Sequence, residues 1–232
     1  MKKDNVYIQA SPTVSYTSLL KNERLIHNRE QFYLQKLCKI INENANAREG
    51  ERTILEIGFN DGNMLRKLST IYKDDKLIGL EVREKCVNDM KTLGYDCRLV
   101  TTELFDMEEK FDIIYGFAVL HHMNNPYDTL ISLFNLLKPN GIIVFMKENH
   151  PFSIQDLIYI SIVNKWKFEK NLFKMNRKRF IDILSKYTTN FYVKYDDNNI
   201  ITCFKHMSYI YYKFKINRIP VLNTLTIFAK FP

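Results

Sequence analysis

The chain has 232 residues, of which 46% are hydrophobic and 13% aromatic, and its formal net charge is +8. This composition excludes an intrinsically disordered chain and supports one sizeable core, so we expect one folded domain. No apolar run reaches about 18 residues, so we expect no transmembrane helix. The basic start, Met1 to Lys3, is not followed by an apolar segment, and we expect no secretory signal.

The cysteines and the charges are informative about location and partners. Widely spaced cysteines with no Cys-x-x-Cys pair support neither disulfides nor a zinc knuckle, so we predict a cytoplasmic protein with reduced thiols. Residues 163–232 contain 14 basic and four acidic residues, a net charge of +10, whereas residues 1–162 carry −2. An anionic partner and a solvated basic face both account for this asymmetry.

Hydrophobic spacing predicts the elements of the first two thirds of the chain. Residues 17–46 have helical spacing, and a polar linker that ends at Gly50 follows. Short apolar strands then alternate with amphipathic helices. We predict strands at 53–57, 76–81, 97–100, 111–115 and 142–146, and helices at 63–72, 83–93 and 128–137. This alternation predicts a parallel sheet covered by helices on both faces.

The pattern changes after residue 150. Residues 152–175 are rich in aromatic residues and read as helices, and Asn176 is a candidate N-cap for a helix at 177–186. Further strands are predicted at 191–195, 200–204 and 224–230. We expect the first and last of these to form an antiparallel pair beside the parallel strands.

A strand, a Gly-bearing turn and a helix follow one another at residues 54–63. Gly58 and Gly62 can adopt positive φ angles and allow a ligand to approach the backbone. The next helix begins with free N–H groups that suit a carboxylate or phosphate. Glu81 ends the following strand, 25 residues after Glu56. In nucleotide-binding α/β folds an acid near this position binds the ribose hydroxyls, at the carboxyl ends of the strands.

These motifs resemble the class I S-adenosylmethionine-dependent methyltransferases over about residues 50–150. The stretch from Glu56 to Gly62 is similar to the first motif of the family, and Leu80-Glu81 to its second. Residues 111–123 and 136–143 are similar to its fourth-strand and fifth-strand signatures. A dinucleotide fingerprint, Gly-x-Gly-x-x-Gly, fits less well because Asn60 interrupts it.

The resemblance implies a Rossmann-like, doubly wound α/β fold. Its seven-stranded sheet would be mostly parallel, with one antiparallel strand and helices on both faces. Within a single domain, residues 1–49 would form a helical lid, residues 50–150 the cofactor-binding core, and residues 151–232 a substrate cover with the final strands.

The resemblance also implies cofactor contacts. Glu56, Gly58 and Gly62 would surround the aminoacyl and ribose parts, Glu81 would bind the ribose diol, and Val82 would pack on adenine. Asn60 replaces a common Gly, which Asn tolerates because it enters the left-handed region readily. Thr102 is the match for the residue near the adenine amino group. The expected cofactor-binding residues are Glu56, Gly58, Asn60, Gly62, Glu81, Val82, Thr102, Gly116 and Phe117.

Candidate catalytic residues follow the fourth and fifth strands. They are His121, His122, Glu148 and His150. Methyl transfer needs an aligned nucleophile, exclusion of water and, for some acceptors, a base, for which neutral His is suited. One histidine of the pair can instead serve packing or cofactor shielding. These residues do not converge on a metal site in the sequence, and the resemblance implies no metal.

We therefore expect a methyltransferase that uses S-adenosylmethionine to methylate oxygen or nitrogen of a small molecule, such as a natural-product or sugar-derived intermediate. The aromatic and basic residues after position 150 suit an aromatic or anionic acceptor. The same residues permit RNA binding, so an RNA or protein methyltransferase is the second hypothesis. A non-catalytic cofactor-binding module is the third.

Overall fold

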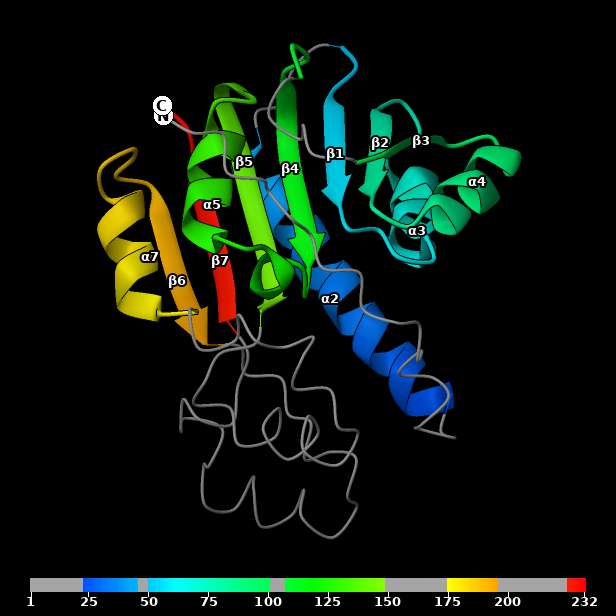
Figure 1. Cartoon of the computed structure of the whole chain (residues 1–232), viewed down its shortest axis with the longest axis horizontal. Helices are drawn as coiled ribbons and strands as arrows, with labels where there is room; N and C mark the ends of the chain where they lie inside the picture. The colour runs from blue at the N-terminus through cyan, green and yellow to red at the C-terminus, as the bar shows by residue number, and fades with distance from the viewer. Residues whose placement is uncertain (1–22, 46–49, 101–106, 149–174, 196–224) are drawn as a thin grey trace, which may run out of the picture.

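The computed structural model describes residues 23–45, 50–100, 107–148, 175–195 and 225–232. Within these residues seven strands form one sheet (Figure 1). The strands are β1 (Thr53–Ile57), β2 (Lys76–Glu81), β3 (Asp96–Leu99), β4 (Phe111–Phe117), β5 (Leu137–Glu148), β6 (Phe191–Tyr195) and β7 (Leu225–Lys230). The helices are α2 (Glu23–Asn44), α3 (Asn63–Ile71), α4 (Glu84–Thr92), the 3-10 turn η1 (Leu120–His122), α5 (Pro126–Phe134) and α7 (Arg177–Leu184).

The strand order is β3-β2-β1-β4-β5-β7-β6. Strands β1 to β5 pair in parallel, and β7 runs antiparallel between β5 and β6. The predicted sheet is therefore confirmed. The order reverses between β1 and β4, and the carboxyl ends of β1, β2 and β4 share the lower edge in Figure 1. Ligands of open α/β sheets bind at such a reversal.

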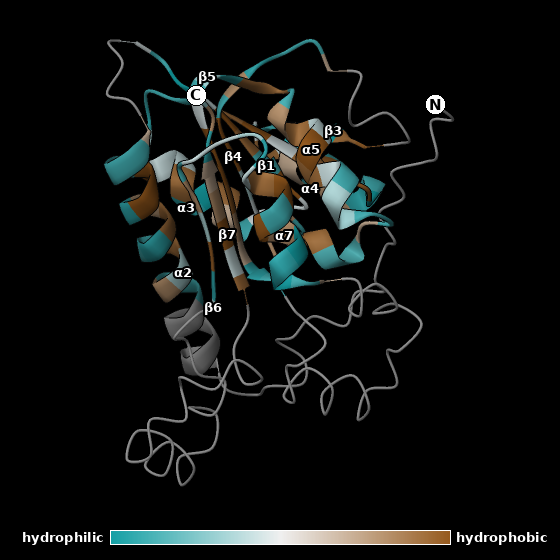
Figure 2. Cartoon of the chain, turned by 90° about the vertical axis from the view of Figure 1, so that its left-hand side faces the viewer, coloured by the Kyte–Doolittle hydropathy of each residue, from teal (hydrophilic) through white to brown (hydrophobic). Residues whose placement is uncertain are grey.

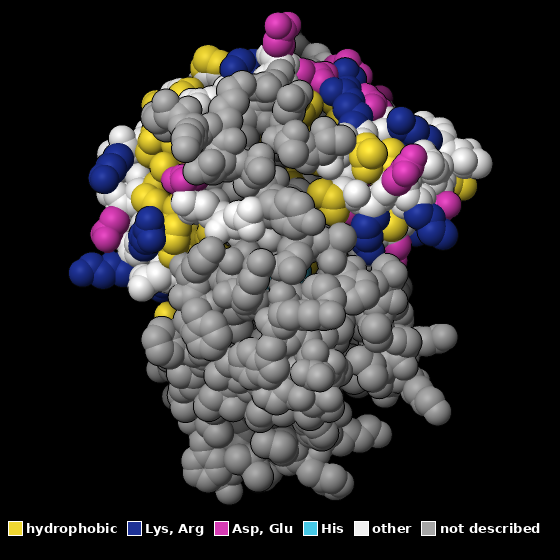
Figure 3. Space-filling model, viewed as in Figure 1, with side chains coloured by type: hydrophobic (Ala, Val, Ile, Leu, Met, Phe, Trp, Pro, Cys, Tyr) yellow, Lys and Arg dark blue, Asp and Glu magenta, His cyan; other side chains and the backbone are white. Residues whose placement is uncertain are grey.

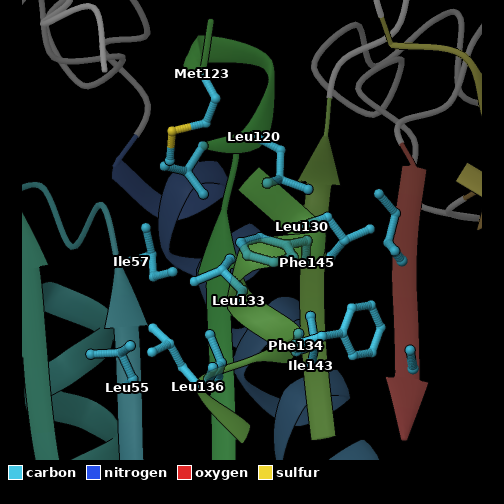
Figure 4. Close-up of a cluster of buried hydrophobic side chains, with 14 of the residues drawn as sticks. Leu55, Ile57, Leu120, Met123, Leu130, Leu133, Phe134, Leu136, Ile143 and Phe145 are labelled. Atoms are coloured by element: carbon cyan, nitrogen blue, oxygen red, sulfur yellow. The ribbon is translucent and has the colours of Figure 1, made fainter. Parts of the chain in front are cut away.

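Helices cover both faces of the sheet (Figure 2). Leu37 of α2 and Leu68 of α3 are fully buried against one face, together with Ile54 and Val144 of the strands. The helices α5 and α7 cover the opposite face through fully buried hydrophobic side chains. Figure 4 shows this second cluster, which contains Leu130 of α5 together with side chains of β1 and β5.

Neighbouring residues of β5 alternate between these two clusters. Ile142 and Val144 pack toward α2, whereas Ile143 and Phe145 pack toward α5. A parallel sheet that is buried on both faces needs apolar side chains at consecutive positions, which is why this strand reads as a continuous apolar run.

The predicted helix at 128–137 is wrong at both ends. The helix α5 begins at Pro126, where the Asn125 side chain accepts hydrogen bonds from two backbone N–H groups and proline suits the first helical position. It ends at Phe134. Strand β5 already pairs with β4 at Leu137, and Asn140, at φ 63°, lies before the position where the pairing continues at Ile142.

The remaining differences are small. The helices α3 and α4 are shorter than predicted by one and two residues, and β4 continues to Phe117. The predicted N-cap is confirmed, because the Asn176 side chain accepts a hydrogen bond from Arg179 N at 3.1 Å. The predicted elements at 152–175 and 200–204 lie outside the described residues. The division into lid, core and cover stays a prediction. No described helix has an apolar stretch that could cross a membrane.

Candidate active site

The turn after β1 contains three residues in the left-handed conformation. Gly58, Asn60 and Gly62 have φ angles of 69°, 57° and 72°, so the predicted tolerance of Asn at this position is confirmed. A Cβ on Gly58 would lie 2.6 Å from Cγ2 of Val119, and one on Gly62 would lie 2.2 Å from Sδ of Met90. Gly58 is therefore required by its backbone angle and by the space around it, and Gly62 by its backbone angle.

Glu81, at the end of β2, is held between two loops. Glu81 is 5% exposed. The carboxylate Oε2 accepts a hydrogen bond from Asn60 N at 2.8 Å, and Oε1 accepts from Val82 N at 2.9 Å and Arg83 N at 3.2 Å. Val82 itself is half-buried against the hydrophobic cluster under α5. The structure thus brings together the turn after β1 and the loop after β2, which were predicted to bind the same ligand.

The side chain of Arg83 also binds Glu81, a contact that was not predicted. Arg83 Nε donates to Oε1 at 3.2 Å and Nη2 donates to Oε2 at 3.1 Å. Nη2 donates to Oδ1 of Asn60 as well, so the guanidinium connects both loops. The only signal in the sequence is an arginine two residues after the acid.

Glu56, in β1, is paired with Tyr115 of the neighbouring β4. The Tyr115 hydroxyl donates to Oε2 of Glu56 at 2.7 Å, and both side chains are buried. Burial raises the pKa of the Glu56 carboxyl to about 8, the hydrogen bond from Tyr115 opposes this shift, and the charges of Asp61 and Glu81 add to it. Glu56 is therefore mostly protonated at neutral pH, and a nearby cation would favour its ionised form.

The end of β4 joins the sheet to α2. A Cβ on Gly116 would lie 2.7 Å from Val119 and 2.8 Å from Phe145, so only glycine fits between these side chains. The half-buried Phe117 packs edge-on against Tyr33 of α2, with ring centroids 6.0 Å apart. These contacts place α2 beside the edge of the sheet where Glu56 and Glu81 lie.

Glu148, at the end of β5, caps the turn η1. Its Oε1 accepts a hydrogen bond from Val119 N at 2.9 Å, and its Oε2 accepts from His121 N at 3.2 Å. Oε2 also lies 2.9 Å from Nδ1 of His121. Glu148 is 0% and His121 1% exposed. The carboxylate therefore fixes both the backbone of η1 and the His121 ring.

A β-bulge directs Glu148 toward η1. The pairing of β5 with β7 shifts register between Phe145 and Glu148, and Lys147 has φ 58°. In a regular strand Glu148 would share a face with Met146, which packs toward α2. The bulge turns Glu148 toward Val119 and His121 instead, as bulges beside functional sites often do.

The remaining predicted site residues are His122, Thr102 and His150. His122 is only half-buried, and its ring centroid lies 4.1 Å from that of the enclosed His121. Thr102 and His150 lie outside the described residues. Among the residues that the structure describes, no three His, Cys, Asp or Glu side chains are grouped as metal ligands would be.

Comparison with known proteins identifies the class. Residues 25–186 match a family model described as a methyltransferase domain. This match spans more than half of the chain, so the chain belongs to the methyltransferase domain family. The predicted membership of the S-adenosylmethionine-dependent methyltransferases is thereby confirmed.

Individual relatives are distant. A protein of Invertebrate iridescent virus 6, 235L, that is named as a methyltransferase is 23% identical over 190 residues, which are 76% of this chain and 69% of that protein. The ubiquinone biosynthesis O-methyltransferase of Roseobacter denitrificans is 27% identical over 122 residues, 49% of this chain and 48% of that enzyme. This alignment therefore spans about half of each protein.

Solved structures share the fold. The plantazolicin methyltransferase BpumL, crystallised with a monoazolic desmethylPZN analog and SAH, has a TM-score of 0.59 to this chain. The two are 16% identical, and the superposition covers 93% of this chain and 89% of the other. At this identity the similarity shows a common fold, and it agrees with the confirmed sheet topology.

Proposed function

We propose that this chain transfers a methyl group from S-adenosylmethionine to oxygen or nitrogen of a small-molecule acceptor. The observation that carries the proposal is the position of Glu81. Its buried carboxylate joins the turn after β1 to the start of α4, beside the point where strand order reverses. A carboxylate at this place suits the two hydroxyls of a ribose.

The other proposed contacts are those that the resemblance to the family implies. The half-buried Val82 would pack on adenine, and the turn from Gly58 to Gly62 would approach the ribose and aminoacyl parts. Glu56 would be ionised by the cofactor's cationic groups. The proposed cofactor-binding residues are those predicted from the sequence, namely Glu56, Gly58, Asn60, Gly62, Glu81, Val82, Gly116 and Phe117, with Thr102 outside the described residues.

For the chemistry, the bound cofactor supplies an electrophilic methyl group on a sulfonium. The chain must align the acceptor, exclude water and, for a hydroxyl or an ammonium, remove a proton. We assign the last task to His122, because the residue is half-buried whereas His121 is enclosed. Glu148 and His121 act as positioning residues that hold η1 and thereby His122. His150 stays a candidate outside the described residues.

A small-molecule acceptor is supported by the name of the ubiquinone biosynthesis relative and by the azole-containing ligand of the plantazolicin methyltransferase. On the face shown in Figure 3, the Lys and Arg side chains of the described residues are interspersed with Asp and Glu and form no continuous patch. An aromatic or anionic acceptor and a cytoplasmic location remain part of the proposal.

Calorimetry with S-adenosylhomocysteine tests the cofactor site. We expect a Kd in the micromolar range, and we expect Glu81→Ala to raise it at least about tenfold, which is about 1.4 kcal/mol. Arg98→Met, which breaks the ion pairs of Arg98 with Asp96 and Glu109, is the control. Absence of binding at high ligand concentration would end the proposal.

Incubation with labelled cofactor and a metabolite extract tests the acceptor. The methylated compound should gain one methyl group, detected by mass spectrometry. Cofactor binding without turnover on any extract would indicate a non-catalytic module. Label transferred to RNA or protein, or RNA binding that weakens steeply with salt, would indicate the macromolecular alternative.

A further inference from the structure

The guanidinium of Arg83 lies where the proposed function places a ribose. It forms a two-point contact with both oxygens of Glu81 and also donates to Oδ1 of Asn60. The Arg83 side chain is 21% exposed and that of Glu81 6%. The cation therefore covers the carboxylate from the solvent side, across the gap between the turn after β1 and the start of α4.

The carboxylate of Glu81 has no free acceptor position in this arrangement. Oε1 accepts hydrogen bonds from the backbone N–H groups of Val82 and Arg83 and from Arg83 Nε. Oε2 accepts from Asn60 N and from Arg83 Nη2. A carboxylate offers about four lone-pair positions, and five donors already occupy them. Two ribose hydroxyls can bind only if some donors leave.

The donors differ in how easily they can leave. The N–H groups of Asn60, Val82 and Arg83 belong to the backbone, and removing them would require movement of the loops. The Arg83 side chain can leave by rotation about its own bonds, because it is partly exposed and its guanidinium can be hydrated instead. The guanidinium is therefore the group that a ligand can displace.

We infer that Arg83 is a displaceable counter-ion that competes with the ribose diol of the cofactor for Glu81. In the ligand-free protein it neutralises the carboxylate and holds its orientation. When the nucleoside binds, two O–H donors replace the two N–H donors of the guanidinium, and the side chain moves into solvent. This inference rests on the proposed function and adds a residue that lowers cofactor affinity.

Removal of the competitor should tighten binding. In Arg83→Met the side chain keeps most of its length but loses its charge and its donors, while the three backbone donors to Glu81 remain. We expect the Kd for S-adenosylhomocysteine, measured by calorimetry, to fall at least about threefold. Arg83→Lys keeps the charge but loses the two-point contact, so its Kd should lie between those of Arg83→Met and the wild type.

Arg98→Met is the matched control. Arg98 binds Asp96, the acid two residues before it, through Nε and Nη2, as Arg83 binds Glu81, but it lies on β3 away from the proposed ribose position. The Kd of Arg98→Met for S-adenosylhomocysteine should equal that of the wild type. Thermal unfolding of each ligand-free variant verifies that it is folded.

The outcomes separate this inference from the proposed function. A wild type that binds the ligand, with Arg83→Met unchanged or weaker, overturns the inference and leaves the proposed function standing. Weaker binding would mean that Arg83 contacts the ligand directly. A wild type that does not bind overturns both. An equal fall in Kd for Arg98→Met would mean that the change in net charge explains the effect, and it would also overturn the inference.

Discussion

The Glu148 carboxylate lies 2.9 Å from Nδ1 of His121, and neither side chain is exposed to solvent. The same carboxylate accepts hydrogen bonds from the backbone N–H groups of Val119 and His121. One buried acid at the end of β5 therefore holds the whole turn that follows β4. This arrangement makes the conformation of η1 depend on a residue 27 positions later in the chain.

Glu148→Gln should weaken both folding and turnover. An amide has only one acceptor oxygen, so at least one of the three donors loses its partner inside the protein. We expect the free energy of unfolding to fall by about 2 kcal/mol or more, measured by urea titration. Turnover should fall because η1 positions His122, and it should fall by a larger factor than cofactor affinity. The exposed acid Glu51, changed to Gln, is the control. An unchanged unfolding free energy would contradict the capping role.

Glu56→Gln should remove a pH dependence of stability. Folding raises the pKa of Glu56 from 4.5 to about 8, so the unfolded chain releases this proton at lower pH than the folded chain. The resulting stabilisation is fully present below about pH 4.5 and is lost as the pH rises to about 8. Across this window the wild type should lose on the order of 4 kcal/mol at most relative to Glu56→Gln.

Urea unfolding at acidic, neutral and mildly alkaline pH measures this difference. Glu108→Gln, at an exposed position before β4, is the control. Its free energy of unfolding should change with pH as that of the wild type does. If the difference in unfolding free energy between Glu56→Gln and the wild type is the same at every pH, the Glu56 carboxyl titrates alike in the folded and unfolded chains.

Ala118→Gly should leave the fold intact and increase its stability. Ala118 follows β4 with φ 50°, a strained angle for a residue with a Cβ, and its N–H is bonded to Met146 O at 3.0 Å. Glycine relieves this strain, which we expect to add up to about 1 kcal/mol to the free energy of unfolding. Ala229→Gly, within the regular strand β7, should instead lower it by about 1 kcal/mol. A loss of stability at position 118 as large as at 229 would argue against strain.

His122→Asn should lower turnover without affecting cofactor binding. If His122 removes the acceptor proton, kcat at neutral pH should fall by about 100-fold or more. The Kd for S-adenosylhomocysteine should stay unchanged, because His122 is not among the proposed cofactor contacts. Steady-state kinetics on the identified acceptor provide the measurement. Full activity of the variant would assign proton removal to another group or show that none is needed.

Much of the fold was predictable from local patterns. Apolar runs and helical spacing identified the strands of the sheet, because burial on both faces imposes a continuous apolar run on each central strand. Gly58, Gly62 and Glu81 were found from their spacing, since the turn needs positive φ angles and the acid must end the next strand. The left-handed conformation of Asn60 also followed from the residue type.

The sequence by itself therefore determined the succession of strands and helices along the chain, the Gly-bearing turn and the acid at the end of β2. Only the tertiary structure decided which side chains meet. Tyr115 reaches Glu56 across 59 positions because β4 lies beside β1, and Glu148 reaches His121 because a bulge at Lys147 turns its side chain. Propensity and periodicity act over a few residues, whereas these contacts depend on strand order and register, which the packing of the whole sheet sets.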